Sequence, residues 1–263
     1  LASIQNLGAM DVLATDKTGT LTQDRVLLER HVDIFGEESR RVLEFACLNS
    51  FFQSGLRNLL DEAVLTHAEL HSDIRSGVGY IKVDEIPFDF ERRRMSVVVG
   101  TTDGTRHYLI CKGAVDEIIA VCDRAERNGV GVPVESGHED ELRAVTRELH
   151  EDGFRVIAVA FKELPPGPAT YEPSDEAHLT LLGYVAFLDP PKETAAVALA
   201  SLRDAGVAVK VLTGDNDAVT RHVCRQVGLP AAVLLLGSDV DALSDAELQT
   251  RVDATTVFAR LAP

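Results

Sequence analysis

Two polar segments of the sequence, each directly behind an apolar run, carry residue types that could do chemistry. Asp16 opens DKTGTLT (16–22) after the run MDVLAT (10–15), and TGD (213–215) follows VAVKVL (207–212). In open parallel sheets, ligands bind beyond the carboxyl ends of the strands, which is where both segments would lie. A carboxylate at such a strand end is either a nucleophile or only the cap of a turn, and the residue type alone leaves both open.

The elements that must position these segments follow two different patterns. Strands and helices alternate near the two ends of the chain, which is typical of a doubly wound α/β fold. The middle of the chain has strand-like segments, two of them joined by the hairpin signal TTDG (101–104), together with helices, which is an α+β pattern. We therefore predict one α/β domain that is split by an inserted module. The expected helices cover 38–50, 56–71, 114–122, 139–152, 189–205, 216–227 and 244–252, and the expected strands cover 10–15, 80–87, 95–101, 106–112, 155–162, 179–187, 207–215, 231–237 and 256–260.

The composition disfavours several classes of function. The 263 residues carry a formal net charge of −16, which argues against nucleic acid or anionic lipid as the primary partner. The two longest apolar stretches, 179–188 and 231–236, are far shorter than the roughly 20 residues of a membrane-spanning helix, and no signal peptide is visible. The four cysteines show no close pair that would indicate a zinc site or a disulfide framework: Cys47, Cys111, Cys122 and Cys224.

Four motifs together resemble one protein family. DKTGTLT is identical to the phosphorylation signature of the P-type ATPases, which are cation pumps that form an aspartyl-phosphate. Within this family, the flanking segments QNLGAMDVL (5–13) and NLLDEAVL (58–65) are most similar to the bacterial magnesium-importing subgroup. The resemblance covers essentially the whole chain, and the motifs stand in the family's order: DKTGTLT (16–22), KGA (112–114), DPPK (189–192) and TGDN (213–216).

The resemblance implies a specific division of the chain. Residues 1–27 and 184–263 correspond to a phosphorylation domain with a doubly wound, HAD-like fold that lacks its C-terminal part. Residues 28–183 correspond to an inserted α+β nucleotide-binding domain, an antiparallel sheet flanked by helices. The sequence opens on LASIQ and stops at FARLAP, so we expect both ends to be boundaries within a longer protein.

The resemblance also assigns the chemistry of the phosphorylation domain. It makes Asp16 the nucleophile that attacks the γ-phosphoryl group of ATP while Mg²⁺ screens the two anions. It implies that Mg²⁺ is held by the Asp16 carboxylate and the backbone carbonyl of Thr18. Thr18, Thr213 and Gly214 are expected to hold phosphate oxygens in the same site, to which Asp215 also belongs.

Thr18 gives a further indication of the kind of reaction. Related phosphatases carry an aspartate two residues after the nucleophile, where it acts as general acid and base and empties the intermediate quickly. Threonine cannot take that role at neutral pH. We therefore expect a phosphoenzyme that persists, as a pump requires when it couples breakdown of the intermediate to a conformational change.

Several residues of the inserted module match nucleotide-binding positions of the family. Phe88 falls on the aromatic residue that stacks on adenine, and Arg93 falls on a basic position near the phosphates. Lys112 ends the apolar run YLIC and is expected to point into the nucleotide pocket, where Gly113 lets the ligand approach the backbone. Without the family pattern, Phe88 and Phe90 would be interpreted as core residues and the neighbouring arginines as a solvated face.

Three more positions match the family less closely. Asp61 occupies the acidic position that faces the adenine amino group, although the family commonly has the longer glutamate there. Arg155 matches an arginine that bridges nucleotide phosphates between domains. Asp189, the first residue of DPPK, matches a ribose or hinge contact.

The expected function follows from these matches. The resemblance implies the cytoplasmic catalytic part of a magnesium-transporting ATPase of the bacterial inner membrane, with ATP and Mg²⁺ as cofactors. Its partners would be the transported divalent cation and the actuator and transmembrane domains of the parent protein, with no nucleic acid. We expect the isolated chain to bind nucleotide weakly and to turn over little or not at all. Two alternatives stay open: a stand-alone HAD-type phosphatase and a non-catalytic nucleotide-sensing module.

Overall fold

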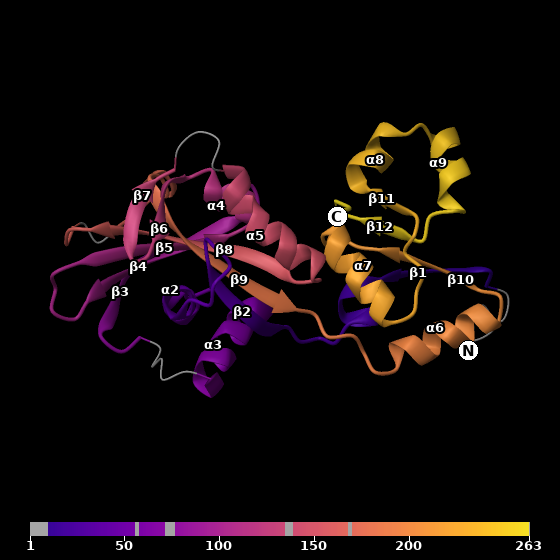
Figure 1. The fold of residues 1–263 in the computed structure, drawn as a ribbon, viewed down its shortest axis with the longest axis horizontal. Helices are drawn as coiled ribbons and strands as arrows, with labels where there is room; N and C mark the ends of the chain where they lie inside the picture. The colour runs from indigo at the N-terminus through magenta and orange to yellow at the C-terminus, as the bar shows by residue number, and fades with distance from the viewer. Residues whose placement is uncertain (1–9, 56–57, 72–76, 135–138, 168–169, 263) are drawn as a thin grey trace. The chain divides into compact units, whose positions relative to one another are not determined.

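The chain folds into two compact units, which Figure 1 shows in a computed structural model. The structure describes residues 10–55, 58–71, 77–134, 139–167 and 170–262. Most of QNLGAMDVL and residues 56–57 of the expected helix 56–71 lie outside the described residues. The first unit comprises Leu1–Arg25, His150–Arg155 and Asp189–Pro263, and the second unit comprises Val26–Leu149 and Val156–Leu188.

A four-stranded parallel sheet forms the centre of the first unit (Figure 1). The sheet and its helices enclose a small core that includes Val211, Val223 and Cys224. The expected alternation of strands and helices is therefore confirmed. The strands lie in the order β1 (Val12–Asp16), β10 (Ala208–Leu212), β12 (Val257–Ala259) and β11 (Leu234–Leu236), and the helices are α6 (Ala195–Asp204), α7 (Asp217–Gln226), α8 (Gly237–Ala242) and α9 (Asp245–Val252).

Two of these helices begin where the sequence supplies an N-cap. The side chain of Asn216 accepts a hydrogen bond of 2.8 Å from the Ala218 amide at the start of α7. Ser244 and Glu247 form a reciprocal capping box at the start of α9, in which each side chain binds the other residue's backbone amide. Both starts agree with the sequence expectation.

Helix α6 begins later than expected. The predicted helix includes DPPK, but the structure starts the helix only at Ala195. The backbone of DPPK is bonded instead to the segment after β1: the Gln23 amide donates to Pro190 O at 2.8 Å, and the Lys192 amide donates to Leu21 O at 2.9 Å. These two hydrogen bonds hold DPPK extended against DKTGTLT.

The second unit is built on one large sheet that is antiparallel except where β6 runs parallel to β9. The strands follow the order β3 (Tyr80–Asp89), β4 (Arg94–Thr101), β5 (His107–Gly113), β8 (Arg155–Leu164), β9 (Leu179–Leu188), β6 (Cys122–Arg127) and β7 (Val130–Pro133), while β2 (Leu27–Asp33) also pairs with β9. Its helices are α2 (Arg40–Phe52), α3 (Leu59–His71), α4 (Val115–Ile119) and α5 (Glu139–Glu151).

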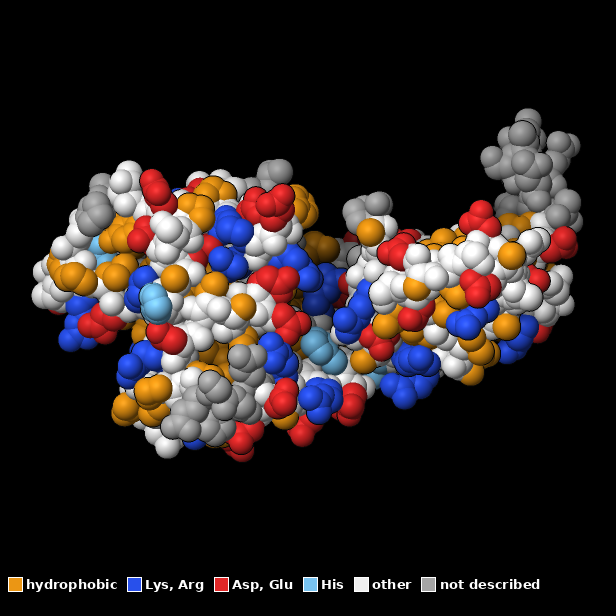
Figure 2. Space-filling model, turned by 90° about the horizontal axis from the view of Figure 1, so that it is seen from above, with side chains coloured by type: hydrophobic (Ala, Val, Ile, Leu, Met, Phe, Trp, Pro, Cys, Tyr) orange, Lys and Arg blue, Asp and Glu red, His pale blue; other side chains and the backbone are white. Residues whose placement is uncertain are grey.

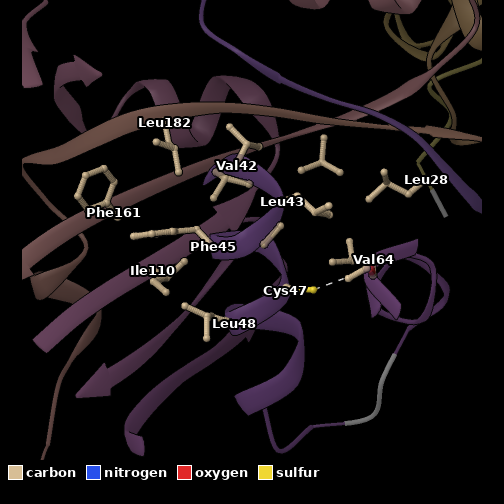
Figure 3. Close-up of a cluster of buried hydrophobic side chains, with 14 of the residues drawn as sticks. Leu28, Val42, Leu43, Phe45, Cys47, Leu48, Val64, Ile110, Phe161 and Leu182 are labelled. Carbon is tan, nitrogen blue, oxygen red and sulfur yellow. Dashed lines mark hydrogen bonds between the residues drawn. The ribbon is translucent and has the colours of Figure 1, made fainter. Parts of the chain in front are cut away.

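Helix α2 supplies much of the core of the second unit. Figure 3 shows Val42, Phe45 and Leu48 on one side of this helix, near Ile110 and Phe161 of the sheet. The rings of Phe45 and Phe161 meet edge to face, with centroids 5.1 Å apart. The apolar stripe that the sequence predicts over 38–50 is therefore the buried face of this helix.

Four elements were not expected from the sequence. Strand β2 and strand β6 carry charged residues at most of their exposed positions, which hides the apolar alternation of a strand. The β6–β7 hairpin turns at Asn128 and Gly129, whose φ angles are 51° and 80°, and Asn-Gly is a strong signal for such a turn. The fourth is α8. The expected helix 114–122 ends at Ile119, because β6 begins at Cys122.

Three further features concern membrane-spanning helices, disulfides and surface charge. Among the described helices, none is both long and apolar enough to cross a bilayer. The four cysteines, all of which the structure describes, form no disulfide bond. On the face that Figure 2 shows, basic side chains are interspersed with acidic ones over the second unit.

Candidate functional site

The sheet of the first unit brings the two polar segments to the same edge. Strands β1 and β10 are parallel neighbours, and Asp16 lies opposite Leu212 in their register. The residues that follow each strand, DKTGT and TGD, therefore leave the sheet side by side at its carboxyl edge. The Asp16 side chain is exposed there, and its Oδ1 accepts a 2.7 Å hydrogen bond from the Lys17 amide.

A tight turn, Lys17–Leu21, follows Asp16. Gly19 has a φ of 74°, and a Cβ there would lie 2.6 Å from Asp24 Oδ1, so the turn requires glycine. The Lys192 ammonium donates to the Gly19 carbonyl, and the Thr22 amide donates to Lys17 O at 3.2 Å. Lys192 of DPPK therefore contacts the DKTGTLT segment directly, and the sequence reasoning did not single this residue out.

Lys17 is the second residue that the sequence reasoning missed. Its side chain is completely buried, and its Nζ lies 2.6 Å from Asp189 Oδ2 and 2.6 Å from Asp215 Oδ2. Successive strand residues point to opposite sides, so the residue after the exposed Asp16 turns into the protein. That alternation is the signal that could have identified Lys17.

Asp215 accepts hydrogen bonds from both polar segments, DKTGT and TGD. Its Oδ2 accepts hydrogen bonds from Thr18 Oγ1 at 3.0 Å and from Thr213 Oγ1 at 3.3 Å, and its Oδ1 accepts one from Arg155. Burial raises the pKa of the Asp215 carboxyl, but the charges of Arg155 and Lys17 outweigh burial, so the pKa lies below its ordinary value. Asp215 is therefore a carboxylate at neutral pH.

Gly214 lies in this turn without a packing requirement for glycine. A Cβ on Gly214 would come 3.4 Å from Leu261 O, which is an ordinary contact. The Leu261 amide donates to Thr213 O at 3.1 Å and so holds the turn from its other side. The role of Gly214 in holding phosphate stays a prediction.

Asp189 is buried in the same unit and has one unsatisfied oxygen. Its Oδ2 is paired with Lys17, and Arg155 Nη2 lies 3.6 Å from that oxygen. Its Oδ1 is enclosed and has no hydrogen-bond partner among the described residues. A buried acceptor without a donor is costly, and because this oxygen is enclosed, the expected ribose or hinge contact of Asp189 stays a prediction.

The donor atoms at the sheet edge fit Mg²⁺. Magnesium prefers oxygen ligands and usually keeps water and phosphate oxygens among them. The Asp16 carboxylate and the Thr18 carbonyl are oxygen donors of this kind. The described residues contain no cluster of three or more histidine, cysteine or acidic side chains suited to a metal. The role of these two oxygens in holding Mg²⁺ stays a prediction.

The second unit contains a buried polar cluster around Lys112. Its ammonium donates to Ser50 Oγ at 2.7 Å and forms an ion pair with Asp61. The Asp61 oxygens also accept from Ser50, Gln53 and the Asn58 amide. Burial raises the pKa of Asp61, but the charge and hydrogen bonds of Lys112 and the other donors lower it below its ordinary value.

This arrangement changes the expected part of Asp61. The side chain is fully buried, and its two oxygens are occupied by protein donors. In this structure Asp61 therefore pairs with Lys112 and accepts a hydrogen bond from Gln53. Its direct contact with adenine stays a prediction. Ser50 and Gln53 were missed, although polar residues on the apolar side of helix α2 were a usable signal.

The aromatic residues before the basic triplet are exposed. Phe88 is 51% exposed and Phe90 is 89% exposed, so the interpretation of both as core residues is wrong. Their rings lie edge to face with centroids 5.3 Å apart. Exposed aromatic pairs of this kind offer a surface on which a base can stack.

The arginines of the basic triplet lie in two different environments. Arg93 has a φ of 48° and is exposed, and its guanidinium is 3.0 Å from Glu117. Arg92 and Arg94 both bond the buried carboxylate of Glu176, with Arg94 Nε 2.9 Å from Glu176 Oε2. The interpretation as a solvated face therefore holds for Arg93 alone, and Glu176, which fixes the other two, was missed.

Gly113 has a packing reason for being glycine. A Cβ there would lie 2.5 Å from Arg93 O and 2.6 Å from Arg94 Cβ, across the β4–β5 pair. Such contacts are too short for any other residue without moving strand β4. The close approach at Gly113 is thus made by the neighbouring strand, and an approach by a ligand stays a prediction.

Comparison with known proteins relates the sequence of this chain to a family. The family model described as "P-type ATPase, cytoplasmic domain N" matches residues 58–194. The chain is 52% identical over 264 residues to "Magnesium-transporting ATPase, P-type 1" of Escherichia coli K12 and 51% identical over 263 residues to a protein of the same name from Salmonella typhimurium LT2. It is 26% identical over 287 residues to a calcium-transporting ATPase of Listeria monocytogenes.

The matches differ in how much of each protein they cover. Each includes 100% of this chain, but only 29% of the two magnesium-transporting ATPases and 32% of the calcium-transporting one. The chain therefore spans less than a third of the length of these relatives. Because the family model covers more than half of its residues, the chain belongs to the P-type ATPase family, in the part that contains cytoplasmic domain N.

Proposed function

We propose that this chain is the cytoplasmic catalytic part of a magnesium-transporting P-type ATPase and that Asp16 accepts the γ-phosphoryl group of ATP. The observation that carries the proposal is the parallel register of β1 and β10, which sets the exposed Asp16 beside the Thr213–Asp215 turn. The names of the relatives that are about half identical to the chain support magnesium as the transported ion.

The two units take the two domain roles in this proposal. The first unit is the phosphorylation domain, with the doubly wound HAD-like fold expected for residues 1–27 and 184–263. The second unit is the nucleotide-binding domain, expected for residues 28–183. The parallel sheet of the first unit and the match of 58–194 to domain N support this assignment.

The chemistry rests on residues whose positions the structure describes. Asp16 carries the nucleophilic oxygen, and Thr18 is oriented by its hydrogen bond to Asp215. Lys17 pairs with Asp215 and Asp189 and holds both side chains in place. When bound, Mg²⁺ would reduce the repulsion between the Asp16 carboxylate and the γ-phosphate of ATP. The Asp16 carboxylate and the Thr18 carbonyl would hold the ion.

Thr18 distinguishes this proposal from a stand-alone phosphatase. Its hydroxyl donates to Asp215 Oδ2 at 3.0 Å, so it is committed to positioning. A hydroxyl cannot serve as general base at neutral pH. Position 18 is a threonine in this sequence, where the related phosphatases have an aspartate. The aspartyl-phosphate should therefore persist until another domain of the parent protein acts on it.

The parent protein supplies the remaining partners in this proposal. It lies in the bacterial inner membrane, with this part on the cytoplasmic side, and its actuator and transmembrane domains complete the cycle. The transported divalent cation binds in the transmembrane domain. The isolated chain binds ATP and turns over little or not at all.

The test is phosphorylation of the full-length protein from γ-labelled ATP. We expect a label that survives acid, is released by hydroxylamine and is absent from the Asp16→Asn protein. Persistent labelling of Asp16→Asn would overturn Asp16 as nucleophile. Nucleotide binding without any label in the wild-type protein would favour the nucleotide-sensing module, and rapid release of phosphate from small phosphoesters would favour the phosphatase.

A further inference from the structure

Gln53 lies at the end of helix α2, where the neighbouring residues are bonded to strands β3 and β5. It is the C-cap of helix α2 and is only 8% exposed. The next residue, Ser54, is fixed to strand β3, because its amide donates to Glu85 Oε2 at 2.7 Å. On the other side, Ser50 accepts a hydrogen bond from Lys112 of strand β5. The end of α2 thus lies between Glu85 and Lys112. Glu85 stands three residues before Phe88 in strand β3.

The orientation of the Gln53 amide is fixed by chemistry. Its Nε2 donates to Asp61 Oδ2, and the reverse orientation would set two acceptors against each other. Asp61 cannot turn away, because Lys112, Ser50 and the Asn58 amide hold both of its oxygens. The Gln53 amide therefore has one direction at neutral pH.

This orientation leaves Gln53 Oε1 as a free acceptor. No residue that the structure describes donates a hydrogen bond to it. In the described chain, the fully enclosed side-chain atoms without a partner are Asn49 Oδ1 and Asp189 Oδ1, so Gln53 Oε1 still reaches the surface. The Gln53 amide is nearly buried, its Nε2 is held by Asp61, and its Oε1 is an available acceptor. Such an amide is suited to recognising a hydrogen-bond donor on a ligand.

The neighbouring Lys112 offers the complementary group. An ammonium has three N–H donors, and the described acceptors for Lys112 are Asp61 and Ser50. One N–H is therefore left for an acceptor on a ligand. The acceptor Gln53 Oε1 and the donor Lys112 therefore lie near each other, at the same end of the sheet as Phe88.

We propose that Gln53 is a specificity-determining residue that accepts a hydrogen bond from the exocyclic amino group of adenine while the base stacks on Phe88. The inference rests on the proposed function, in which the second unit binds ATP. A purine with an oxygen at position 6 would place an acceptor against Gln53 Oε1. Inosine and guanine nucleotides should therefore bind more weakly than adenine nucleotides.

Calorimetric titration of the 263-residue chain tests this proposal with three nucleotides. ATP, ITP and N6,N6-dimethyl-ATP share the triphosphate and the stacking face, but only ATP has N–H donors at position 6. We expect the wild-type chain to bind ATP about tenfold more tightly than either analogue, which is the size of one good hydrogen bond. This comparison needs no variant, so it does not depend on how a substitution affects folding.

The variant Gln53→Leu links the preference to this residue. We expect it to bind all three nucleotides with affinities within about twofold of one another, because the acceptor is gone. Gln249→Leu, on the exposed surface of α9 in the first unit, is the matched control and should keep the wild-type preference. The thermal unfolding midpoint of each variant checks that it is folded.

The outcomes separate this inference from the proposed function. Binding of ATP, ITP and dimethyl-ATP by the wild-type chain with equal affinity would overturn the role of Gln53 and leave ATP binding intact. An unchanged ATP preference in folded Gln53→Leu would do the same. Absence of binding by any of the three nucleotides would overturn both the inference and the nucleotide-binding role of the second unit.

Discussion

The Nζ atom of Lys17 lies 2.6 Å from Asp215 Oδ2, and the lysine side chain is completely buried. The same Nζ is 2.6 Å from Asp189 Oδ2. The residue directly after the proposed nucleophile therefore joins DKTGT to the first acid of DPPK and to the acid of TGD. One buried ammonium thus fixes three segments that are far apart in the sequence.

Replacement of Lys17 by methionine should destabilise the first unit strongly. The change keeps the length of the side chain but removes one of the two cations, Lys17 and Arg155, that pair with both Asp189 and Asp215. Breaking a buried pair in this way costs about 3–5 kcal/mol of unfolding free energy. Urea denaturation of the wild-type and Lys17→Met chains measures the difference.

Lys82→Met is the matched control for this prediction. Lys82 Nζ also lies within hydrogen-bond distance of a carboxylate, 2.7 Å from Glu85 Oε2, but its side chain is partly exposed. An ion pair at the surface contributes about 1 kcal/mol or less. If Lys17→Met lowered the unfolding free energy no more than Lys82→Met, the buried bridge would have no structural importance.

Asp61 should make the stability of the second unit depend on pH in acid. Burial raises its pKa, but Lys112 and the other donors lower it further, so the folded pKa lies below the unfolded one of about 3.9. As the pH falls, the unfolded chain therefore takes up the proton first. The contribution of Asp61 is complete above the unfolded pKa and is lost as the pH falls through the folded pKa.

An NMR titration of the Asp61 carboxyl carbon measures this directly. The expected midpoint is below about 3.9, and the unfolding free energy should decline over the same range of pH. The slope should be smaller in Asp61→Asn, which cannot lose a proton. A titration midpoint at or above that of an aspartate in an unfolded peptide would show that Lys112 does not stabilise the charge.

Sequence patterns predicted most of the elements but few of the contacts that build the candidate site. The apolar run before Asp16 and the turn at 213–215 indicated two strand ends, and the parallel register brings them together. Strand alternation could have indicated that Lys17 points inward, but its partners could not be assigned in the same way, because a lysine beside an exposed aspartate has the composition of a surface turn. Its burial depends on Asp189 and Asp215, which stand 172 and 198 positions later.

The buried cluster of the second unit was hidden for a similar reason. Lys112 and Asp61 are 51 residues apart, and they become partners because helix α3 packs on helix α2, which in turn packs on strand β5. The family pattern gave both residues roles toward a ligand. The structure adds that they first satisfy each other, which a local pattern cannot reveal.

Replacement of Gly113 by alanine should destabilise the second unit. The new Cβ would meet Arg93 O at 2.5 Å and Arg94 Cβ at 2.6 Å, so strand β4 must shift. Overpacking of this kind costs about 1–3 kcal/mol. Gly55→Ala is the control, because a Cβ on Gly55 meets nothing within 4 Å, and it should change the unfolding free energy by about 0.5 kcal/mol or less. Equal effects of the two substitutions would contradict the packing reason for Gly113.

Replacement of Phe88 by alanine should weaken ATP binding without weakening the fold. Half of this side chain is exposed, so little buried surface is lost, whereas stacking of a base on an aromatic ring contributes about 1–3 kcal/mol, or roughly 5- to 150-fold in affinity. Phe35→Ala is the matched control, because Phe35 is 53% exposed and Phe88 is 51% exposed. Calorimetry with ATP and thermal unfolding together decide the matter. An ATP affinity that falls equally in both variants, or in neither, would remove Phe88 from the nucleotide site.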